Sequence, residues 1–373
     1  MKDTKQFRQS NIELLRIVSM FMIVVHHYAT HGIRQSFNPY MGEIWLEGDA
    51  LHRITTSFCM PGGTIGVGIF FLLTGYFMYG KKYKLQRLFK LLLQVYFYSI
   101  IMCIVCIMLK YFHIYDFPEL KNTTLDFVKN ALYPITSKSS GWFTQTYFVL
   151  FLFIPVINSF LERINTKCYV YLLLIVWFLW YAGTALIQSN YTDLQRGVFF
   201  YLLGVYLKRT NFKMNNTVAF ISFILMWVAF AFIDYLTVNN SKGIFEVLMR
   251  QVRHLVCIPI AVVALFCFFK NLNIKNSKFI NTVAATTFGI YLVHDCACGK
   301  PLVWNCIFHT LDIQYQSEWF IWYLIGTCIT VFCVLSTIDY LRIRFIEKRY
   351  MPYCDNILHK IIAKIKSNNS NAN

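Results

Sequence analysis

The first apolar stretch of the chain, residues 11–31, holds several residues with ionisable side chains, and four of them are the first candidates for chemistry. They are Glu13, Arg16, His26 and His27. Ionisable groups are costly at membrane depth, so they are usually retained for a task and face protein or water instead of lipid. An imidazole can accept a proton near neutral pH, and a guanidinium can stabilise developing negative charge. These residue types indicate proton transfer beside an anionic group.

The spacing places three of these residues on one face of a helix. Arg16 and His27 are eleven positions apart, which at about 100° per residue brings them within roughly 20° of the same direction. Glu13 precedes Arg16 by one turn and can pair with it, whereas His26 falls roughly 80° away. A snorkelling arginine and an interfacial histidine would give the same spacing. Helix geometry alone therefore leaves a functional and a structural interpretation open.

Membrane-spanning helices must position these residues. Of the 373 residues, 57% are hydrophobic and 14% charged, whereas a soluble globular domain carries about 25% charged residues. The net charge of +17 does not indicate nucleic-acid binding, because the basic residues cluster in short segments between apolar runs, where they orient the chain. We therefore expect an integral membrane protein.

The apolar runs predict an all-α, polytopic membrane helix bundle of about ten transmembrane helices. Every segment predicted to lie inside the cell is basic, which puts both termini in the cytoplasm of a multi-pass plasma-membrane protein. Residues 1–345 are expected to form one transmembrane domain, and residues 346–373 a basic cytoplasmic tail, partly disordered. The runs are residues 12–31, 64–80, 88–110, 142–161, 168–187, 197–207, 217–236, 254–270, 280–298 and 318–340.

Five motifs are spread along nearly the whole chain. The first span carries Arg16, ten intervening residues and His27, and the second carries GVGIFFLLTGYF. GWFTQTYFVLFLFIP begins at Gly141, TTFGIYLVHD covers residues 286–295, and YLRIRFIEKRY closes the last span. Together these motifs resemble acyltransferase family 3, membrane enzymes that O-acylate bacterial surface sugars. The chain departs from the family pattern at Glu13, where aspartate is usual, at Thr74, where serine is usual, and at Leu93-Gln94, where a proline is expected.

The resemblance implies transfer of an acyl group, acetyl or succinyl, from acyl-coenzyme A to a carbohydrate hydroxyl, with O-acetyl transfer from acetyl-CoA expected. His27 would act as general base, or as a covalent acyl carrier. Arg16 would orient the donor or stabilise the thioester oxyanion, and Glu13 would hold Arg16 in place. For this to work, Arg16 and His27 must line one wet cleft that the donor reaches from the cell interior.

Further residues are assigned to the two substrates. Arg87 and Lys90, in a basic segment on the predicted inner side, suit the phosphates of acyl-CoA, although an orientation signal explains them equally well. Tyr291 and His294, three apart on a predicted helix, and Trp142 are candidates for binding the acceptor. Interfacial roles would also explain Trp142 and His294.

No metal or disulfide site is expected. His27 and His31 are four apart, but the sequence shows no convincing third ligand. Seven of the twelve cysteines lie in apolar runs, where a thiol behaves as a small hydrophobe. Two other classes of function remain open: a transporter or flippase of a polysaccharide or lipid-linked substrate, and a structural scaffold of the polysaccharide-synthesis machinery, which is also a possible partner of an enzyme.

Overall fold

The computed structural model describes residues 9–36, 44–118, 124–135, 141–185, 192–240, 243–356 and 360. All regular structure in these residues is helical, which confirms the predicted fold class. The predicted tail is described only as far as residue 356 and at residue 360, and the rest of it lies outside the described residues.

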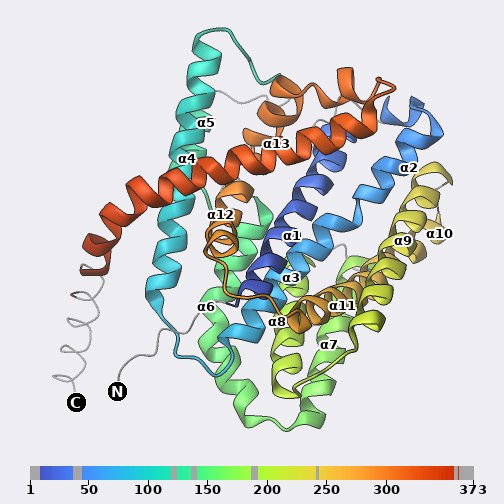
Figure 1. The fold of residues 1–373 in the computed structure, drawn as a ribbon, viewed down its shortest axis with the longest axis vertical. Helices are drawn as coiled ribbons and strands as arrows, with labels where there is room; N and C mark the ends of the chain where they lie inside the picture. The colour runs from blue at the N-terminus through green and yellow to red at the C-terminus, as the bar shows by residue number, and fades with distance from the viewer. Residues whose placement is uncertain are drawn as a thin grey trace.

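The described part of the chain contains thirteen α-helices (Figure 1). Several continue into short π-helical segments, among them η1 (Tyr28–Ile33), which follows α1, and η6 (Arg342–Glu347), which follows α13. The helices are α1 (Ser10–His27), α2 (Ala50–Cys59), α3 (Pro61–Met78), α4 (Leu85–Tyr111), α5 (Thr124–Leu132), α6 (Trp142–Arg163), α7 (Thr166–Ala185), α8 (Thr192–Arg209), α9 (Asn216–Asn240), α10 (Ile244–Val252), α11 (Ile258–Asn271), α12 (Lys278–His294) and α13 (Phe320–Leu341).

Each of the ten predicted spans coincides with a helix. Seven helical segments of the described chain are long and apolar enough to cross a membrane, and they include α1, α3, α4, α6, α9, α11 and α13. The other three predicted spans fall on α7, α8 and α12, which are shorter in their described apolar part or carry more charge. The helix of the last span reaches Asn356, well beyond the predicted end at residue 340. The chain is a multi-pass membrane protein.

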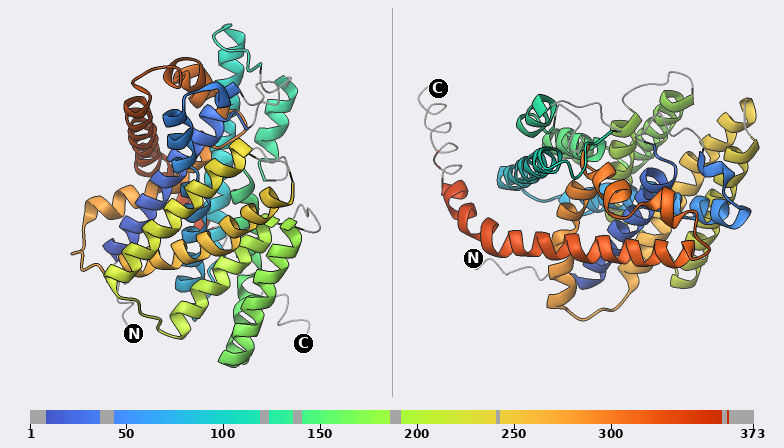
Figure 2. Two further views of the ribbon diagram at one scale, coloured as in Figure 1. Left: turned by 90° about the vertical axis from the view of Figure 1, so that its right-hand side faces the viewer. Right: turned by 90° about the horizontal axis from the view of Figure 1, so that it is seen from above.

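Helix α1 lies inside the bundle and packs against α3, α11, α12 and α13. Its residues Leu15, Ile23 and Val24 are almost completely buried. Helix α13 runs obliquely across the face turned toward the viewer in Figure 1 and lies along one side of the bundle when seen from above (Figure 2). The outer helices α4, α7, α9 and α13 expose many leucine, isoleucine and phenylalanine side chains, as expected of surfaces that face lipid.

Glycines in α3 allow its neighbours to approach closely. A Cβ atom added at Gly66 would lie 2.6 Å from the carbonyl oxygen of Ser19 in α1, and one added at Gly75 would lie 2.0 Å from that of Tyr201 in α8. Small residues at such contacts are typical of helix packing in membranes. These glycines therefore let α3 pack closely against both α1 and α8.

A Gly75→Ala substitution should destabilise the bundle, because the added methyl group would collide with backbone that cannot move away. Overpacking of this kind typically costs about 1–3 kcal/mol. Thermal unfolding of the detergent-purified protein measures the effect. Gly326→Ala in α13 is the matched control, since a Cβ atom there meets no atom within 4 Å. Equal unfolding temperatures for both variants would contradict this packing.

Candidate functional site

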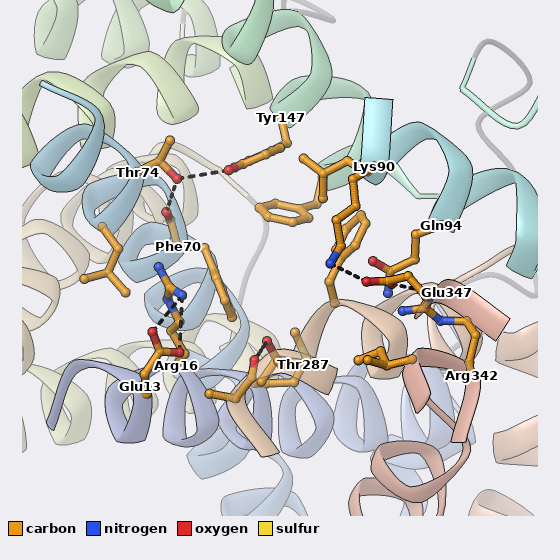
Figure 3. Close-up of a pocket in the computed structure, with 18 residues that line it drawn as sticks. Glu13, Arg16, Phe70, Thr74, Lys90, Gln94, Tyr147, Thr287, Arg342 and Glu347 are labelled. Carbon is orange, nitrogen blue, oxygen red and sulfur yellow. Dashed lines mark hydrogen bonds and ion pairs between the residues drawn. The ribbon is translucent and has the colours of Figure 1, made fainter. Parts of the chain in front are cut away.

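A cavity of about 390 Å³ lies beside the first half of α1 (Figure 3). Its volume falls within the range of about 300–1,000 Å³ that is usual for small-molecule sites. Side chains from α1, α3, α4, α6, α12 and η6 contribute to its walls. The lining residues are Glu13, Arg16, Met20, Phe70, Leu73, Thr74, Lys90, Leu91, Gln94, Phe143, Tyr147, Ala284, Ala285, Thr287, Phe288, Arg342, Ile343 and Glu347.

One wall of the cavity carries the predicted pair of Glu13 and Arg16. Arg16 Nη1 lies 3.2 Å from Glu13 Oε1 and 3.3 Å from Glu13 Oε2. The Glu13 side chain is buried, whereas about a third of the Arg16 side chain, 34%, remains exposed. The carboxylate therefore holds the guanidinium at the cavity wall while leaving part of it free for a ligand.

In Figure 3 a second ionic group lies across the cavity from Arg16. Lys90 forms an ion pair with Glu347, and Arg342 Nη1 donates to Glu347 Oε2 at 2.8 Å. Arg342 Nε also donates to Asp339 at 2.6 Å, and Asp339 accepts a hydrogen bond from Tyr98. Asp339, Arg342 and Glu347 are buried, whereas the Lys90 side chain is about half exposed, 48%. The network fixes the end of α13 and η6 against α4, so that the wall bearing Lys90 is preformed.

Polar and apolar groups alternate over the rest of the cavity. The hydroxyl groups of Thr74 and Tyr147 lie 3.4 Å apart, and Thr74 also donates to the carbonyl oxygen of Phe70 at 2.8 Å. Phe143 and Phe288 provide aromatic surface. An extended ligand that carries both amide groups and methylene groups would suit such a lining.

The second candidate group surrounds His27, at the other end of α1. His27 and His294 are both buried, and His27 Nδ1 lies 2.9 Å from His294 Nε2. His27 Nε2 lies 3.6 Å from Asp295 Oδ1, and His31 Nε2 lies 3.0 Å from the same oxygen. Lys300 Nζ is 3.4 Å from that oxygen as well. The site thus joins α1 and η1 to the end of α12, and η1 is the kind of π-helical turn that often marks functional sites.

An ionic contact anchors the segment that carries His31. Arg34, which directly follows η1, lies 2.5 Å from Asp234 of α9, and Arg253 pairs with the same carboxylate. All three side chains are largely buried. Breaking such a buried group leaves an unpaired charge, which is strongly destabilising, so the position of η1 is well defined.

Aromatic rings separate the two groups of candidate residues. Phe143 lines the cavity and its ring centroid lies 5.2 Å from that of Tyr291, which in turn lies 6.3 Å from that of His294. The described residues that line the cavity do not include His27. The expectation that Arg16 and His27 line one cleft is therefore wrong for this structure, because Phe143 and Tyr291 fill the space between them.

Other predicted site residues lie around these two groups. Arg87 does not line the cavity; its Nη1 atom lies 3.0 Å from Met78 Sδ. The Arg196 guanidinium lies over the Trp142 ring, with its central carbon, Cζ, 4.3 Å from the ring centroid. Tyr291 is buried, and a Cβ atom added at Gly141 would lie 2.3 Å from its hydroxyl oxygen and 2.9 Å from Asp295 Oδ2, so the hydroxyl and the carboxylate are neighbours.

His26 has a different environment from His27. Its Nδ1 atom lies 2.8 Å from the carbonyl oxygen of Met60, and its Nε2 atom lies 3.1 Å from the hydroxyl of Thr30. A Cβ atom at Gly63 would collide with its ring. His26 is therefore a packed histidine with both nitrogens bonded, in agreement with its predicted position away from the Arg16 face.

Sequence reasoning missed Asp295 and Lys300 near His27, and it did not assign Arg342 or Glu347 to the cavity. Asp295 directly follows His294 in the motif TTFGIYLVHD, and Arg342 and Glu347 belong to YLRIRFIEKRY. Both motifs were recognised, but neither spacing nor helix periodicity relates these residues to α1. Only the three-dimensional packing does.

Asp295 also supplies the third potential metal ligand that the sequence did not show. Among the described residues, one ligand atom each from His27, His31 and Asp295 lie within 4.8 Å of one another. Two histidines and a carboxylate can hold a divalent metal ion. The ammonium group of Lys300 also lies close to Asp295, 3.4 Å from Oδ1.

Comparison with known proteins identifies the family. A family model described as an acyltransferase domain, that of acyltransferase 3, matches residues 9–339, which include Arg16, His27 and Asp295 but end before Arg342 and Glu347. No curated protein and no solved structure matches the chain. The match covers most of the 373 residues, and the chain therefore belongs to the acyltransferase 3 family of membrane acyltransferases.

Proposed function

We propose that the protein transfers an acyl group, most simply acetyl, from acyl-CoA in the cytoplasm to a hydroxyl of a cell-surface or exported carbohydrate. The main supporting observation is that α1 carries Arg16 on a cavity near its first turn and His27 in a buried cluster at its far end. The positive-inside rule assigns the first of these ends, and both chain termini, to the cytoplasm. Donor and acceptor would therefore approach from opposite sides.

The cavity is the proposed donor site. Its mixture of hydroxyl, amide and apolar groups suits the pantetheine arm, which carries amides and methylene groups. The phosphates would lie outside, near exposed basic residues of the segment that follows α3, including Lys82, Lys84 and Arg87. Arg16 would bind the thioester oxygen, where a guanidinium stabilises the negative charge that develops during transfer. Glu13 would keep Arg16 oriented.

The cluster around His27 is the proposed acceptor site. His27 would remove the proton of the acceptor hydroxyl, and His294 would orient the His27 ring. The hydroxyl of Tyr291 would bind the carbohydrate together with Trp142, since aromatic rings present an apolar face and a polar edge. Phe143 and Tyr291 must move apart so that the thioester, its oxygen still bound by Arg16, meets the acceptor hydroxyl beside His27.

Radiolabelled acetyl-CoA incubated with membranes that contain the protein tests this function. We expect label in an extracted glycan fraction, and no label with membranes that lack the protein. A transporter or flippase would move its substrate without labelling it, and a scaffold would do neither. Unlabelled glycan in active, glycan-producing membranes would refute acyl transfer.

Lys90→Ala should raise the KM for acetyl-CoA more than Arg87→Ala does. Lys90 lines the cavity, whereas Arg87 points at Met78. Loss of a charge-assisted hydrogen bond costs about 1.5–3 kcal/mol, which corresponds to roughly tenfold or more in KM. Initial rates at varied acetyl-CoA concentration measure the difference. A larger effect of Arg87→Ala would show that the phosphates outside the cavity contribute more to donor binding than the cavity wall at Lys90 does.

A further inference from the structure

We infer that Asp295 is a positioning residue for the base, His27. Its carboxylate stabilises the imidazolium that forms when Nε2, the basic atom of His27, takes the proton of the acceptor hydroxyl. The inference rests on the proposed function and adds to it the last residue of the motif TTFGIYLVHD, to which the sequence alone assigned no role. Asp295 is 2% exposed and directly follows α12.

The hydrogen bonds around His294 determine which nitrogen of His27 is basic. His294 Nδ1 lies 2.6 Å from the carbonyl oxygen of Ile290. A carbonyl oxygen can only accept, so this nitrogen carries a proton, and His294 Nε2 is then an acceptor in the neutral ring. His27 Nδ1 must donate to it across 2.9 Å. Neutral His27 therefore has its lone pair on Nε2, the atom that faces Asp295.

Asp295 is fully engaged while His27 is neutral. A carboxylate only accepts, so His31 Nε2 donates to Asp295 Oδ1 at 3.0 Å, and Lys300 balances the negative charge from 3.4 Å. His31 Nδ1 is bonded in turn to the hydroxyl of Ser36. These contacts hold the carboxylate in place, so it does not depend on His27 for a partner.

The contact between His27 and Asp295 gains strength only during the reaction. Neutral Nε2 and the carboxylate oxygen are both acceptors, and their separation of 3.6 Å is longer than a hydrogen bond. When the acceptor O–H proton moves to Nε2, the pair becomes an N–H donor beside a carboxylate. An interaction that forms only as the transition state is approached accelerates the chemical step.

The proton balance of the transfer is then complete. The acceptor oxygen forms a bond to the thioester carbonyl carbon as its proton passes to His27 Nε2, and the carbon–sulfur bond of the donor breaks. The electron pair of that bond leaves with sulfur, and the proton held by His27 restores the thiol of coenzyme A. Asp295 stays ionised throughout and is not consumed.

A metal ion at the same three atoms is the competing interpretation. It would replace the proton between His31 and Asp295 and occupy the lone pair of His27, which would then be no base. Lys300 argues against it, since an ammonium 3.4 Å from the shared oxygen repels a divalent cation. Metal analysis of the purified protein therefore belongs to the test.

The test compares D295N with the wild type using two acceptors, water and hydroxylamine, with acetyl-CoA as donor. Removal of assistance to a general base should slow hydrolysis by up to about 100-fold. Hydroxylamine attacks through an amine that needs no prior deprotonation, so its rate should remain near that of the wild type. D295E, which keeps the charge, should restore part of the hydrolysis and serves as the second variant if D295N is recovered poorly.

Two controls make the result specific. Asp312→Asn changes an exposed aspartate of the same region and should leave both rates unchanged. In a His27→Ala background, D295N should add little, since Asp295 acts through His27. If D295N slows the reactions with water and with hydroxylamine equally, in an enzyme that is otherwise active, the inference is wrong but acyl transfer stands. The same conclusion follows if the purified protein holds one metal ion per chain and its removal stops the reaction. A wild type that transfers no acetyl group would overturn both.

Discussion

His27→Ala should reduce acetyl transfer to carbohydrate or water by about 10²- to 10⁴-fold, the range typical of a lost general base. The variant should still bind acetyl-CoA, because His27 does not belong to the described lining of the cavity that carries Arg16. Steady-state rates together with equilibrium binding of the donor separate these two effects. Loss of donor binding along with activity would place the thioester directly at His27.

His26→Ala is the matched control for this experiment. His26 adjoins His27 in the sequence, but its ring is bonded to Met60 and Thr30 and packed on Gly63. Its removal leaves a cavity and should lower the unfolding temperature while the folded fraction retains activity. Activity in His27→Ala membranes comparable to that of the wild type would end the assignment of His27 as the base.

The parts of the site that lie on one helix could be predicted from the sequence. Helical periodicity placed Glu13 and Arg16 one turn apart, and the structure pairs them at 3.2 Å. Hydropathy located all ten predicted helices, because each must present apolar residues to lipid or to its neighbours. Short-range regularities of this kind depend only on backbone geometry and on the solvent.

Contacts between distant segments could not be predicted in the same way. Asp295 is 268 positions from His27, and helix periodicity gives no relation between them. The aromatic rings of Phe143 and Tyr291 that divide the expected cleft come from two further helices, α6 and α12. Close approach at Gly66 and Gly75 determines how the helices pack, and with it which side chains meet.

This division has a mechanistic consequence. If donor and base lie on opposite sides of Phe143 and Tyr291, the resting protein keeps the thioester away from water at the acceptor end. Exclusion of water until the rings separate would limit wasteful hydrolysis of acyl-CoA. Phe143 and Tyr291 are themselves buried, so their separation requires the side chains packed around them to move as well.

Arg16→Ala should lower kcat for acetyl transfer by about 10²- to 10³-fold, as expected when a donor to a developing oxyanion is removed. Arg16→Lys should recover only part of this loss, since an ammonium lacks the planar pair of donors that a guanidinium presents. Glu13→Gln should cost less than either change, because it removes only the partner that orients Arg16 at 3.2 Å. Single-turnover rates with radiolabelled acetyl-CoA measure the three variants. Unchanged kcat in Arg16→Ala would mean that the guanidinium serves only as a membrane anchor, and the cavity beside it would then need another role.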